Sequence, residues 1–363
     1  MKVAFTVEQA WHRVPGGTAV AAIEAARALI QRGDVDLVGL SARHGGAPNM
    51  KLPSTLEMRQ MPLPRIVLYE AWHRLRRPKV DVAITAPDVI HATSFPVPPR
   101  SSALVLTVHD LAFVREPAHF TARGNRFFRR GLELALEDAD LVVCPSEATV
   151  ADCIAQGFKR DRLRVVPLGV DLRRASEEEV IRVKAKHGLD KPYVLWVGTI
   201  EPRKNLPALA DAFASLKRDD LDLVLVGPTG WNEDVGAATA PAADRVRLLG
   251  SVERKELSAL YAGATVFCFP SLLEGFGFPV LEAMAQSTAV VTSRGTSTEE
   301  IAGGAAILVE PRETATIAEG LQRVLDDPAL REELSTAGAR RAEGFTWERT
   351  AQGLAEVYRE AAA

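Results

Sequence analysis

Residues 266–285, VFCFPSLLEGFGFPVLEAMA, constrain the fold of this chain more than any other stretch. The apolar, β-prone residues 265–269 predict a buried strand. A loop with two glycines and one acid, Glu274, follows, and Pro279 stands where a helix can begin without a cost for its missing N–H. A strand, a glycine-rich loop and a helix N-terminus predict an anion site, because backbone N–H groups and the positive end of the helix dipole meet at one point.

Two acids flank this predicted anion site. Glu274 lies on the loop and Glu282 lies on the helix, with seven residues between them. A carboxylate beside an anion repels it unless the carboxylate binds something else, and a vicinal diol is a suitable partner because it donates two hydrogen bonds. The pattern therefore predicts a ligand with a diphosphate at its centre and a hydroxylated ring at each end, which describes a nucleotide sugar. A solvated loop acid and a surface helix glutamate are the simpler alternative.

The run E-G-F-G-F-P-V-L-E-A-M-A, residues 274–285, resembles the E-x7-E motif of retaining GT-B glycosyltransferases, family 4 among them. The resemblance covers nearly the whole chain. It implies an α/β fold of the GT-B class, with two Rossmann-like doubly wound domains facing across a cleft. We expect an acceptor-side domain over residues 1–172, with a final helix over 346–363 packing back onto it, and a donor-binding domain over 173–345.

The length of 363 residues is comfortable for two domains, and the charge is divided unevenly between them. Residues 1–170 hold 22 Lys and Arg against 17 Asp and Glu, whereas the remainder holds 22 against 30. This asymmetry predicts different partners for the two halves.

In the first domain, a strand over 2–7 and a helix over 18–32 flank the pair Gly16-Gly17. Such a pair lets the backbone approach a ligand, or it forms a tight turn; the resemblance implies contact with the donor phosphates and the acceptor. His109 stands at the carboxyl end of a predicted strand, the edge at which open α/β sheets bind ligands, although a lone His is as often structural. The run T-V-H-D-L resembles the family's acceptor-domain motif, which implies that His109 lies near the transferred sugar and that Asp110 is a structural or acceptor-side partner.

In the second domain, Arg203 and Lys204 stand together at a helix start, where the dipole favours acids unless an anion is bound. The run G-x-x-x-x-R-K-N resembles the family's site for the donor diphosphate. Gly227 and Ser251 follow two further predicted strands, and the resemblance implies that backbone at the second of these holds the nucleobase.

The resemblance thus implies a set of roles. Glu282 would bind the ribose diol, Glu274 the hexose hydroxyls, and the helix N-terminus the leaving diphosphate. The predicted catalytic residues are His109, Arg203, Lys204 and Glu274, and the predicted donor-binding residues are Gly16, Gly17, Gly227, Ser251, Phe276, Gly277, Phe278, Leu281 and Glu282.

The implied function is a retaining hexosyltransferase that needs neither cofactor nor metal. Three D-x-D patterns resemble metal sites, but all precede predicted strands and so lie at the wrong sheet edge: 34–36, 138–140 and 220–222. The expected donor is of the GDP-mannose or UDP-glucose type, with mannose favoured. The expected acceptor is a growing surface polysaccharide, a glycolipid or a lipid-linked saccharide, or alternatively a small molecule.

Residues 59–80 and 120–130 mix aromatic and basic side chains, which is typical of contact with an anionic membrane surface and also of a solvated helix face. No nucleic-acid motif accompanies them, and the chain carries a net charge of −3. The beginning of the chain lacks a signal-peptide pattern, and no apolar run reaches the length of a membrane span. Cys144 and Cys268 stand in apolar runs typical of buried reduced thiols. We therefore expect a cytoplasmic protein, which would touch the inner face of the membrane if the two basic segments bind anionic lipids.

Two other functions compete. A nicotinamide-dependent oxidoreductase would use the same Rossmann elements, but the first strand is not followed by a complete G-x-G-x-x-G. A catalytically silent nucleotide-sugar-binding subunit would be expected to lose some of Arg203, Lys204, Glu274 and Glu282, which are all present. The sequence carries no signal for the oligomeric state.

Overall fold

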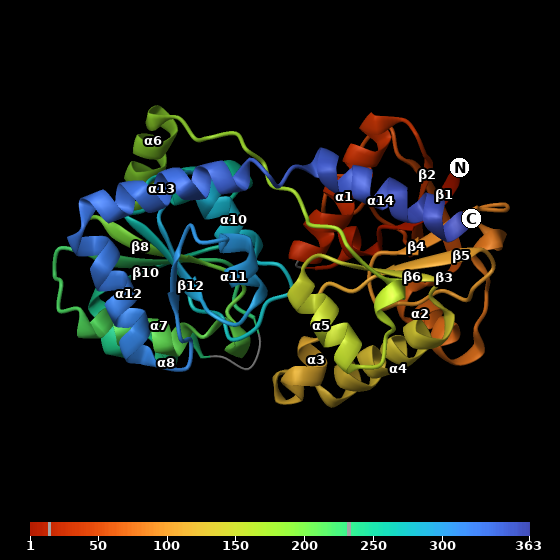
Figure 1. Ribbon diagram of the computed structural model, residues 1–363, viewed down its shortest axis with the longest axis horizontal. Helices are drawn as coiled ribbons and strands as arrows, with labels where there is room; N and C mark the ends of the chain where they lie inside the picture. Colours follow the sequence, from red (N-terminus) through yellow and green to blue (C-terminus); the bar gives the residue numbers. More distant parts are fainter. Residues whose placement is uncertain (14–15, 231–233) are drawn as a thin grey trace. The chain divides into compact units, whose positions relative to one another are not determined.

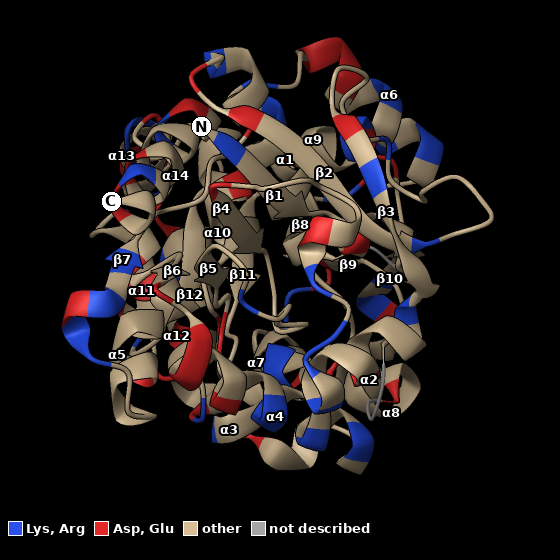
Figure 2. Ribbon diagram, turned by 90° about the vertical axis from the view of Figure 1, so that its right-hand side faces the viewer, with Lys and Arg blue, Asp and Glu red and all other residues tan. Residues whose placement is uncertain are grey.

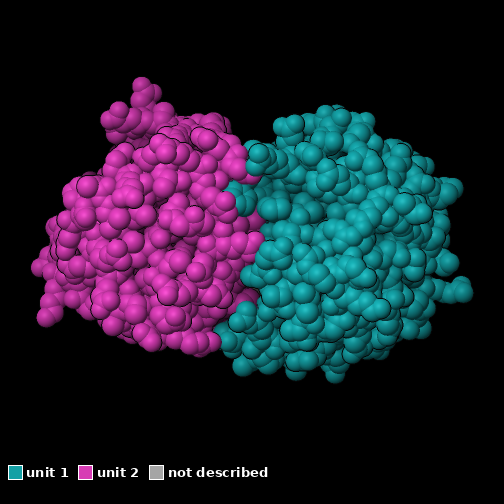
Figure 3. Space-filling model, viewed as in Figure 1, with its two compact units in different colours: residues 1–169, 345–363 teal, residues 170–344 magenta. Residues whose placement is uncertain are grey.

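The computed structural model describes residues 1–13, 16–230 and 234–363. The chain divides into two compact units, coloured separately in Figure 3: unit 1 holds Met1–Gly169 and Phe345–Ala363, and unit 2 holds Val170–Gly344. Each unit is built on one parallel sheet with helices on both of its faces (Figure 1), so the expected α/β architecture of two Rossmann-like domains is confirmed.

Unit 1 contains a seven-stranded sheet in the order β3-β2-β1-β4-β5-β6-β7. Its strands are β1 (Lys2–Thr6), β2 (Asp36–Arg43), β3 (Glu57–Pro64), β4 (Val89–Ala92), β5 (Ala103–Thr107), β6 (Leu141–Cys144) and β7 (Leu163–Val165). Its helices are α1 (Gly17–Arg32), α2 (Arg65–Leu75), α3 (Ala112–Arg115), α4 (Ala122–Asp138), α5 (Glu147–Ala155) and α14 (Trp347–Ala362). From the sequence alone, residues 163–171 are expected to form the last strand of this domain, but β7 ends at Val165, and β3 is not expected at all.

The two faces of this sheet carry separate apolar cores, because successive side chains of a buried parallel strand point to opposite faces. One core joins the sheet to α1 and to the C-terminal α14, through residues such as Phe5, Leu29 and Tyr358. The other joins it to α2, α4 and α5, through Trp72, Leu134 and others. The last helix of the chain is therefore part of the first unit's core.

Unit 2 contains a six-stranded sheet in the order β10-β9-β8-β11-β12-β13. Its strands are β8 (Tyr193–Val197), β9 (Asp222–Val226), β10 (Val246–Gly250), β11 (Val266–Phe269), β12 (Val290–Ser293) and β13 (Ile307–Val309). Its helices are α6 (Glu177–His187), α7 (Leu206–Ser215), α8 (Val235–Thr239), α9 (Arg254–Ala262), α10 (Phe278–Ala285), α11 (Ser297–Ala302), α12 (Thr314–Asp326) and α13 (Pro328–Ala342). The strands β8, β9, β11 and β12 are buried along their whole length.

The strand order reverses between β1 and β4 in unit 1 and between β8 and β11 in unit 2. At such a reversal the loops leave in opposite directions, which opens a crevice outside the carboxyl ends of the strands. The loops that carry the predicted site residues start at these strands: those of Arg203, Lys204 and Glu274 follow β8 and β11, and the glycine pair follows β1.

Candidate active site

The loops after β8 and β11 meet through a cluster of charged side chains. Lys204 ends a short 3₁₀ helix, Pro202–Lys204, and its Nζ lies 2.5 Å from Glu274 Oε1. Arg203 Nη1 lies 3.2 Å from the same oxygen, and Ser271 Oγ donates to it over 2.6 Å. Lys204 and Glu274, which are 70 positions apart in the sequence and which the resemblance assigns to the same donor, therefore lie in one cluster.

The cluster is almost sealed from water, since the side chains of Lys204 and Glu274 are each 8% exposed. Burial raises the pKa of Glu274, but the charges of Lys204 and Arg203 outweigh it and hold that pKa below its ordinary value. Burial, together with the charge of Arg203, lowers the pKa of Lys204 although Glu274 lies beside it. An ionised carboxylate inside a cationic pocket is the state that this geometry favours.

Further contacts hold the two cations in place. Arg203 Nη2 pairs with Glu201 over 2.7 Å, and its Nη1 donates to the Leu273 carbonyl. The Lys204 ammonium lies 4.8 Å from the centre of the Phe269 ring. Asn205, whose φ of 58° is left-handed, closes the loop by donating to the carbonyls of Pro270 and Pro311. The sequence analysis did not assign a role to three of these residues: Glu201, Asn205 and Ser271. Glu201 stands two residues before Arg203, and Ser271 stands three residues before Glu274, so their short spacing could have suggested local pairs.

The helix α10 begins as predicted, with Pro279 in its first turn and Gly277 as its N-cap. Gly277 has a φ of +104°, and a Cβ there would lie 2.9 Å from Thr298 Cγ2, so this position requires glycine. Its neighbours Phe276 and Phe278 pack edge to face, with ring centres 5.4 Å apart. Leu281 is fully buried, and its N–H donates to the Gly277 carbonyl within the helix, so its role in donor binding stays a prediction.

Glu282 lies one turn further into α10, on its partly exposed side. Its Oε2 accepts a hydrogen bond of 3.0 Å from the Tyr261 hydroxyl of α9. Burial raises the pKa of Glu282, whereas the Tyr261 bond and the charge of Arg254 act in the opposite direction without cancelling it. Tyr261 was not singled out from the sequence, and nothing in its local pattern marks it.

Gly227 follows the carboxyl end of β9, and Ser251 follows the carboxyl end of the neighbouring strand β10. The Gly227 N–H donates to the Gly250 carbonyl over 2.9 Å, next to the exposed Ser251. A Cβ on Gly227 would lie 1.9 Å from the Gly198 carbonyl oxygen, which explains the glycine by backbone packing. Backbone packing alone therefore requires glycine at position 227, and the predicted contact of Gly227 with the donor stays a prediction.

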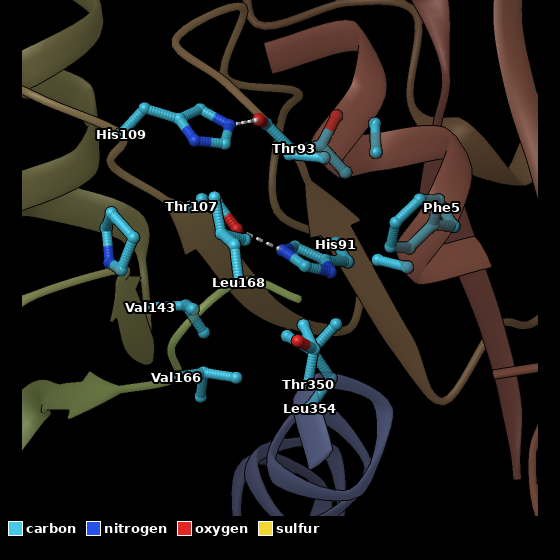
Figure 4. A pocket seen from close by; sticks show the side chains of 14 residues that line it. Phe5, His91, Thr93, Thr107, His109, Val143, Val166, Leu168, Thr350 and Leu354 are labelled. Atoms are coloured by element: carbon cyan, nitrogen blue, oxygen red, sulfur yellow. Dashed lines mark hydrogen bonds between the residues drawn. The ribbon is translucent and has the colours of Figure 1, made fainter. Parts of the chain in front are cut away.

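In unit 1, Gly16 caps α1 and Gly17 begins it; both are exposed. A Cβ on Gly16 would meet nothing within 4 Å, so packing inside the unit does not demand this glycine. His109 follows β5, and its Nε2 donates to the Thr93 carbonyl over 3.0 Å (Figure 4). Burial lowers the pKa of His109 despite the nearby Asp110, so the neutral ring carries its lone pair on Nδ1.

His109 borders a small cavity that also touches α1 and α14 (Figure 4). Below it, His91 of β4 bonds Thr107 through Nε2 and the Tyr358 hydroxyl through Nδ1, each over 2.7 Å. Burial lowers the pKa of His91 to about 3, so this ring is a neutral structural group. Asp110 accepts from the Ala112 N–H and thereby shapes the loop.

The three D-x-D patterns lie at the amino ends of β2, β6 and β9, as predicted. Their acids bind neighbouring arginines or backbone: Asp34 pairs with Arg32, Asp138 with Arg76, Asp140 with the Leu104 N–H and Asp222 with Arg247. Within residues 1–13, 16–230 and 234–363, no three His, Cys, Asp or Glu side chains are grouped to hold a metal ion. Metal independence itself stays a prediction.

Comparisons with known proteins agree across both units. The family model described as "Glycosyltransferase Family 4" matches residues 15–174, and the one described as "Glycosyl transferases group 1" matches residues 177–341. The chain is 31% identical to O-antigen chain mannosyltransferase B of Escherichia coli over 281 residues, which cover 75% of this chain and 74% of that protein.

Two further matches extend this result. D-inositol 3-phosphate glycosyltransferase of Salinispora tropica is 33% identical over 72% of this chain, but the chain spans only 59% of that relative's length. The structure of sucrose-phosphate synthase from Thermosynechococcus elongatus superimposes with a TM-score of 0.79 at 22% identity, over 99% of this chain and 98% of that one, and so shows the same fold. The chain belongs to the group 1, family 4 glycosyltransferases and is a glycosyltransferase with the GT-B type of fold.

Proposed function

We propose that this glycosyltransferase moves a hexose, in the first place mannose, from a nucleoside-diphosphate sugar to a hydroxyl group of a glycan, glycolipid or lipid-linked saccharide. The anomeric configuration is retained, and neither metal nor cofactor takes part. The observation that carries the proposal is the buried cluster of Arg203, Lys204 and Glu274 at the switch point of unit 2. It combines two cations for a diphosphate with one carboxylate for hydroxyl groups.

The two cations would stabilise the negative charge that grows on the leaving diphosphate. Arg203 and Lys204 are held by Glu201, Glu274 and Phe269, so little rearrangement is needed when that charge develops. The N-terminus of α10, with Gly277 as its cap, adds the positive end of a helix dipole. Phe276 and Phe278, on either side of Gly277, would contact the donor at this helix N-terminus.

Glu274 and Glu282 would accept hydrogen bonds from the hydroxyl groups of the donor. All described contacts of the Glu274 carboxylate converge on Oε1, and no described hydrogen bond engages Oε2, which suits the hexose. Glu282 Oε2 accepts from Tyr261, and the carboxylate can also accept from the ribose diol. Gly227 and Ser251 would lie on the nucleobase side.

In the transfer step, the acceptor oxygen forms a bond to the anomeric carbon on the face that the diphosphate leaves. The bond from that carbon to the phosphate oxygen breaks, its electron pair stays on the diphosphate, and the acceptor proton passes to the same leaving group. No protein nucleophile is required. His109, neutral with a lone pair on Nδ1, would lie against the transferred sugar. Gly16 and Gly17 would contact the donor phosphates.

The choice of mannose rests on the name of the Escherichia coli relative, together with the T-V-H-D-L run around His109. A UDP sugar, with UDP-glucose as its type, and a small-molecule acceptor form the second candidate. Its small-molecule acceptor is favoured by the Salinispora relative, whose name specifies D-inositol 3-phosphate.

We also propose that unit 1 touches an anionic membrane surface at the cytoplasmic face. The structure brings the two basic, aromatic segments together: Tyr69 of α2 stacks on Phe127 of α4 at 5.9 Å, and Arg130 donates to the His73 carbonyl. Figure 2 shows Lys and Arg residues along α4, and Ile66, Val67 and Leu75 of α2 are exposed. In the described chain no helix is both long and apolar enough to cross a bilayer.

The donor site is tested by calorimetric titration of the full chain with GDP, UDP and NAD, repeated on Glu282→Ala. We expect one nucleoside diphosphate to bind selectively and its affinity to fall at least about tenfold in the variant, since a charged hydrogen bond contributes about 1.5–3 kcal/mol. The matched control is Glu319→Ala, an exposed glutamate of α12.

Binding of NAD alone, or equal binding by Glu282→Ala, would remove the assignment. Nucleotide binding without transfer to any glycan acceptor would leave the silent binding subunit as the better description. Turnover in excess EDTA tests metal independence, and the anomeric coupling in the NMR spectrum of the product tests retention.

A further inference from the structure

A second pocket of unit 1 lies at the carboxyl ends of β1, β2 and β4, under α2. It offers about 10 Å³ of free space, the scale of one hydroxyl group or one water molecule. Its walls combine polar groups with the rings of Tyr69 and Trp72: Glu8, Gln9, Ser41 and Ser94 are the main polar ones. None of the predicted site residues belongs to this lining.

Gln9 is the unusual member of this lining. It is 3% exposed, and its Oε1 is buried without a hydrogen-bond partner among the residues that the structure describes. Its Nε2 donates to Thr93 Oγ1 over 2.8 Å and to Ser94 Oγ over 3.2 Å. A buried amide oxygen without a donor costs about 1–3 kcal/mol, so a group that enters the pocket and donates to Gln9 Oε1 would be stabilised there.

The orientation of this amide is fixed by its neighbours. Thr93 Oγ1 donates its one hydrogen to the Thr6 carbonyl over 2.7 Å, so toward Gln9 it can only accept. The nitrogen of Gln9 therefore faces Thr93, because rotating the amide by 180° would set Oε1 against an oxygen that has no hydrogen left to donate. The missing partner is a hydrogen-bond donor.

The surrounding charge selects the kind of donor. Glu8, 5% exposed, uses Oε2 to accept from the Ala42 N–H and Oε1 to pair with His44, each over 2.8 Å. This carboxylate opposes the entry of a phosphate or another anion. A neutral hydroxyl group suits the pocket, since it can donate to Gln9 Oε1 and accept from Ser94 or Tyr69.

Thr93 connects this pocket to His109. Its side chain accepts from Gln9, and its carbonyl accepts from His109 Nε2. A single residue, Thr93, therefore links the side chain that would bind the hydroxyl group, Gln9, to the His109 ring, which we place at the transferred sugar.

We infer that this pocket is a recognition subsite for the acceptor, in which Gln9 Oε1 accepts a hydrogen bond from a hydroxyl or hydroxymethyl group of a neutral sugar residue. The inference rests on the proposed function, because it supplies the acceptor side of the same transfer. It makes the recognised part of the acceptor a saccharide rather than a phosphate group.

The test uses saturation-transfer NMR on the full chain, with methyl α-D-mannopyranoside as the probe and inorganic phosphate as a competitor. We expect the wild-type protein to bind the glycoside, phosphate to leave that binding unchanged, and Gln9→Leu to weaken it about fivefold or more. Gln352→Leu, the same change at an exposed glutamine of α14, is the control.

Tyr69→Phe is a second variant, because Tyr69 lines the pocket and the change removes only its hydroxyl while it keeps the stacking on Trp72 and Phe127. It should also weaken glycoside binding. Calorimetry with GDP in the same samples reports on the donor site separately. Unchanged glycoside binding in both variants, no binding in a wild-type protein that does bind GDP, or displacement by phosphate would overturn the subsite alone. Loss of GDP binding with Gln9-dependent glycoside binding intact would instead remove the proposed donor function.

Discussion

At the scale of single residues, the ion pairs around Glu274 are the feature with the largest energetic consequence. Removing one partner of a buried pair leaves the other charge uncompensated and costs about 3–5 kcal/mol. Lys204 and Glu274 are both buried, and Arg203 is confined beside them. The site residues therefore also hold the loops after β8 and β11 together.

The first prediction concerns the pH dependence of this cluster. Because the pKa of Glu274 in the folded protein lies below its ordinary value of 4.5, the carboxylate stabilises the fold above that pH and the contribution is lost as the pH falls through the folded pKa. Glu274→Gln should lower the free energy of unfolding by about 3–5 kcal/mol at neutral pH, and by progressively less in acid. Urea unfolding of both proteins over a pH series measures the difference.

Glu319→Gln, at an exposed position of α12, should show no comparable loss at any pH. A difference between Glu274→Gln and the wild-type protein that stays constant down to acid pH would contradict the ion-pair account, because it would then not depend on the charge of the carboxylate.

The second prediction compares two glycines of unit 2. Gly277 and Gly295 have φ values of +104° and +72°, but only at Gly277 would a Cβ collide, with Thr298 Cγ2 at 2.9 Å. Gly277→Ala should destabilise the protein by clearly more than the 1–2 kcal/mol expected for a left-handed alanine, and should weaken nucleotide binding, whereas Gly295→Ala should show about that backbone cost alone. Thermal unfolding and calorimetry of both variants decide this.

At the scale of elements, local patterns predicted most of the sheet strands, and the failures have identifiable causes. β3 was missed because Pro62 and Pro64 argue against a strand, yet the structure places it at the sheet edge, where one side needs no ladder. The strand over 163–171 ends at Val165, since the chain then turns along α14: a Cβ on Gly169 would lie 2.3 Å from the Trp347 backbone nitrogen. A contact between residues so far apart in the sequence leaves no local signal.

The same reasoning applies to the site. Arg203 and Lys204 were found as two cations at a helix start, Glu274 was found through its spacing from Glu282 beside a helix N-terminus, and both runs resemble motifs of the family. Tyr261, which binds Glu282, and Thr93, which orients His109, act through contacts between separate elements. Their neighbours in the sequence do not mark them.

The third prediction concerns the attachment of α14 to unit 1. Tyr358 donates or accepts at His91 Nδ1 inside the core, and both residues are buried. Tyr358→Phe leaves a buried ring nitrogen unpaired, at a cost of about 1–3 kcal/mol, so the amides of α14 should exchange with deuterium about five- to a hundredfold faster. Tyr193→Phe, which removes a buried hydroxyl bond to the Leu260 carbonyl in unit 2, should leave exchange in α14 unchanged.

At the scale of the whole molecule, charge divides between the units. The acidic second half carries the cluster assigned to the donor, and the basic first half carries α2 and α4. Several arginines on α4 have no ion-pair partner within the described part of the chain: Arg123, Arg126 and Arg129. Such a surface attracts anionic lipids with about 1 kcal/mol per basic residue near the membrane.

The last prediction tests this surface by co-sedimentation with vesicles. The full chain should bind vesicles that contain phosphatidylserine and not purely zwitterionic ones, and raised salt should release it because the attraction is screened. The double change Arg126→Glu and Arg129→Glu should reduce binding at least about tenfold, whereas Arg294→Glu with Arg340→Glu, exposed positions of unit 2, should not. If both double variants bind as the wild-type protein does, the basic face of α2 and α4 is a solvated helix surface, and the acceptor must reach unit 1 without help from the membrane.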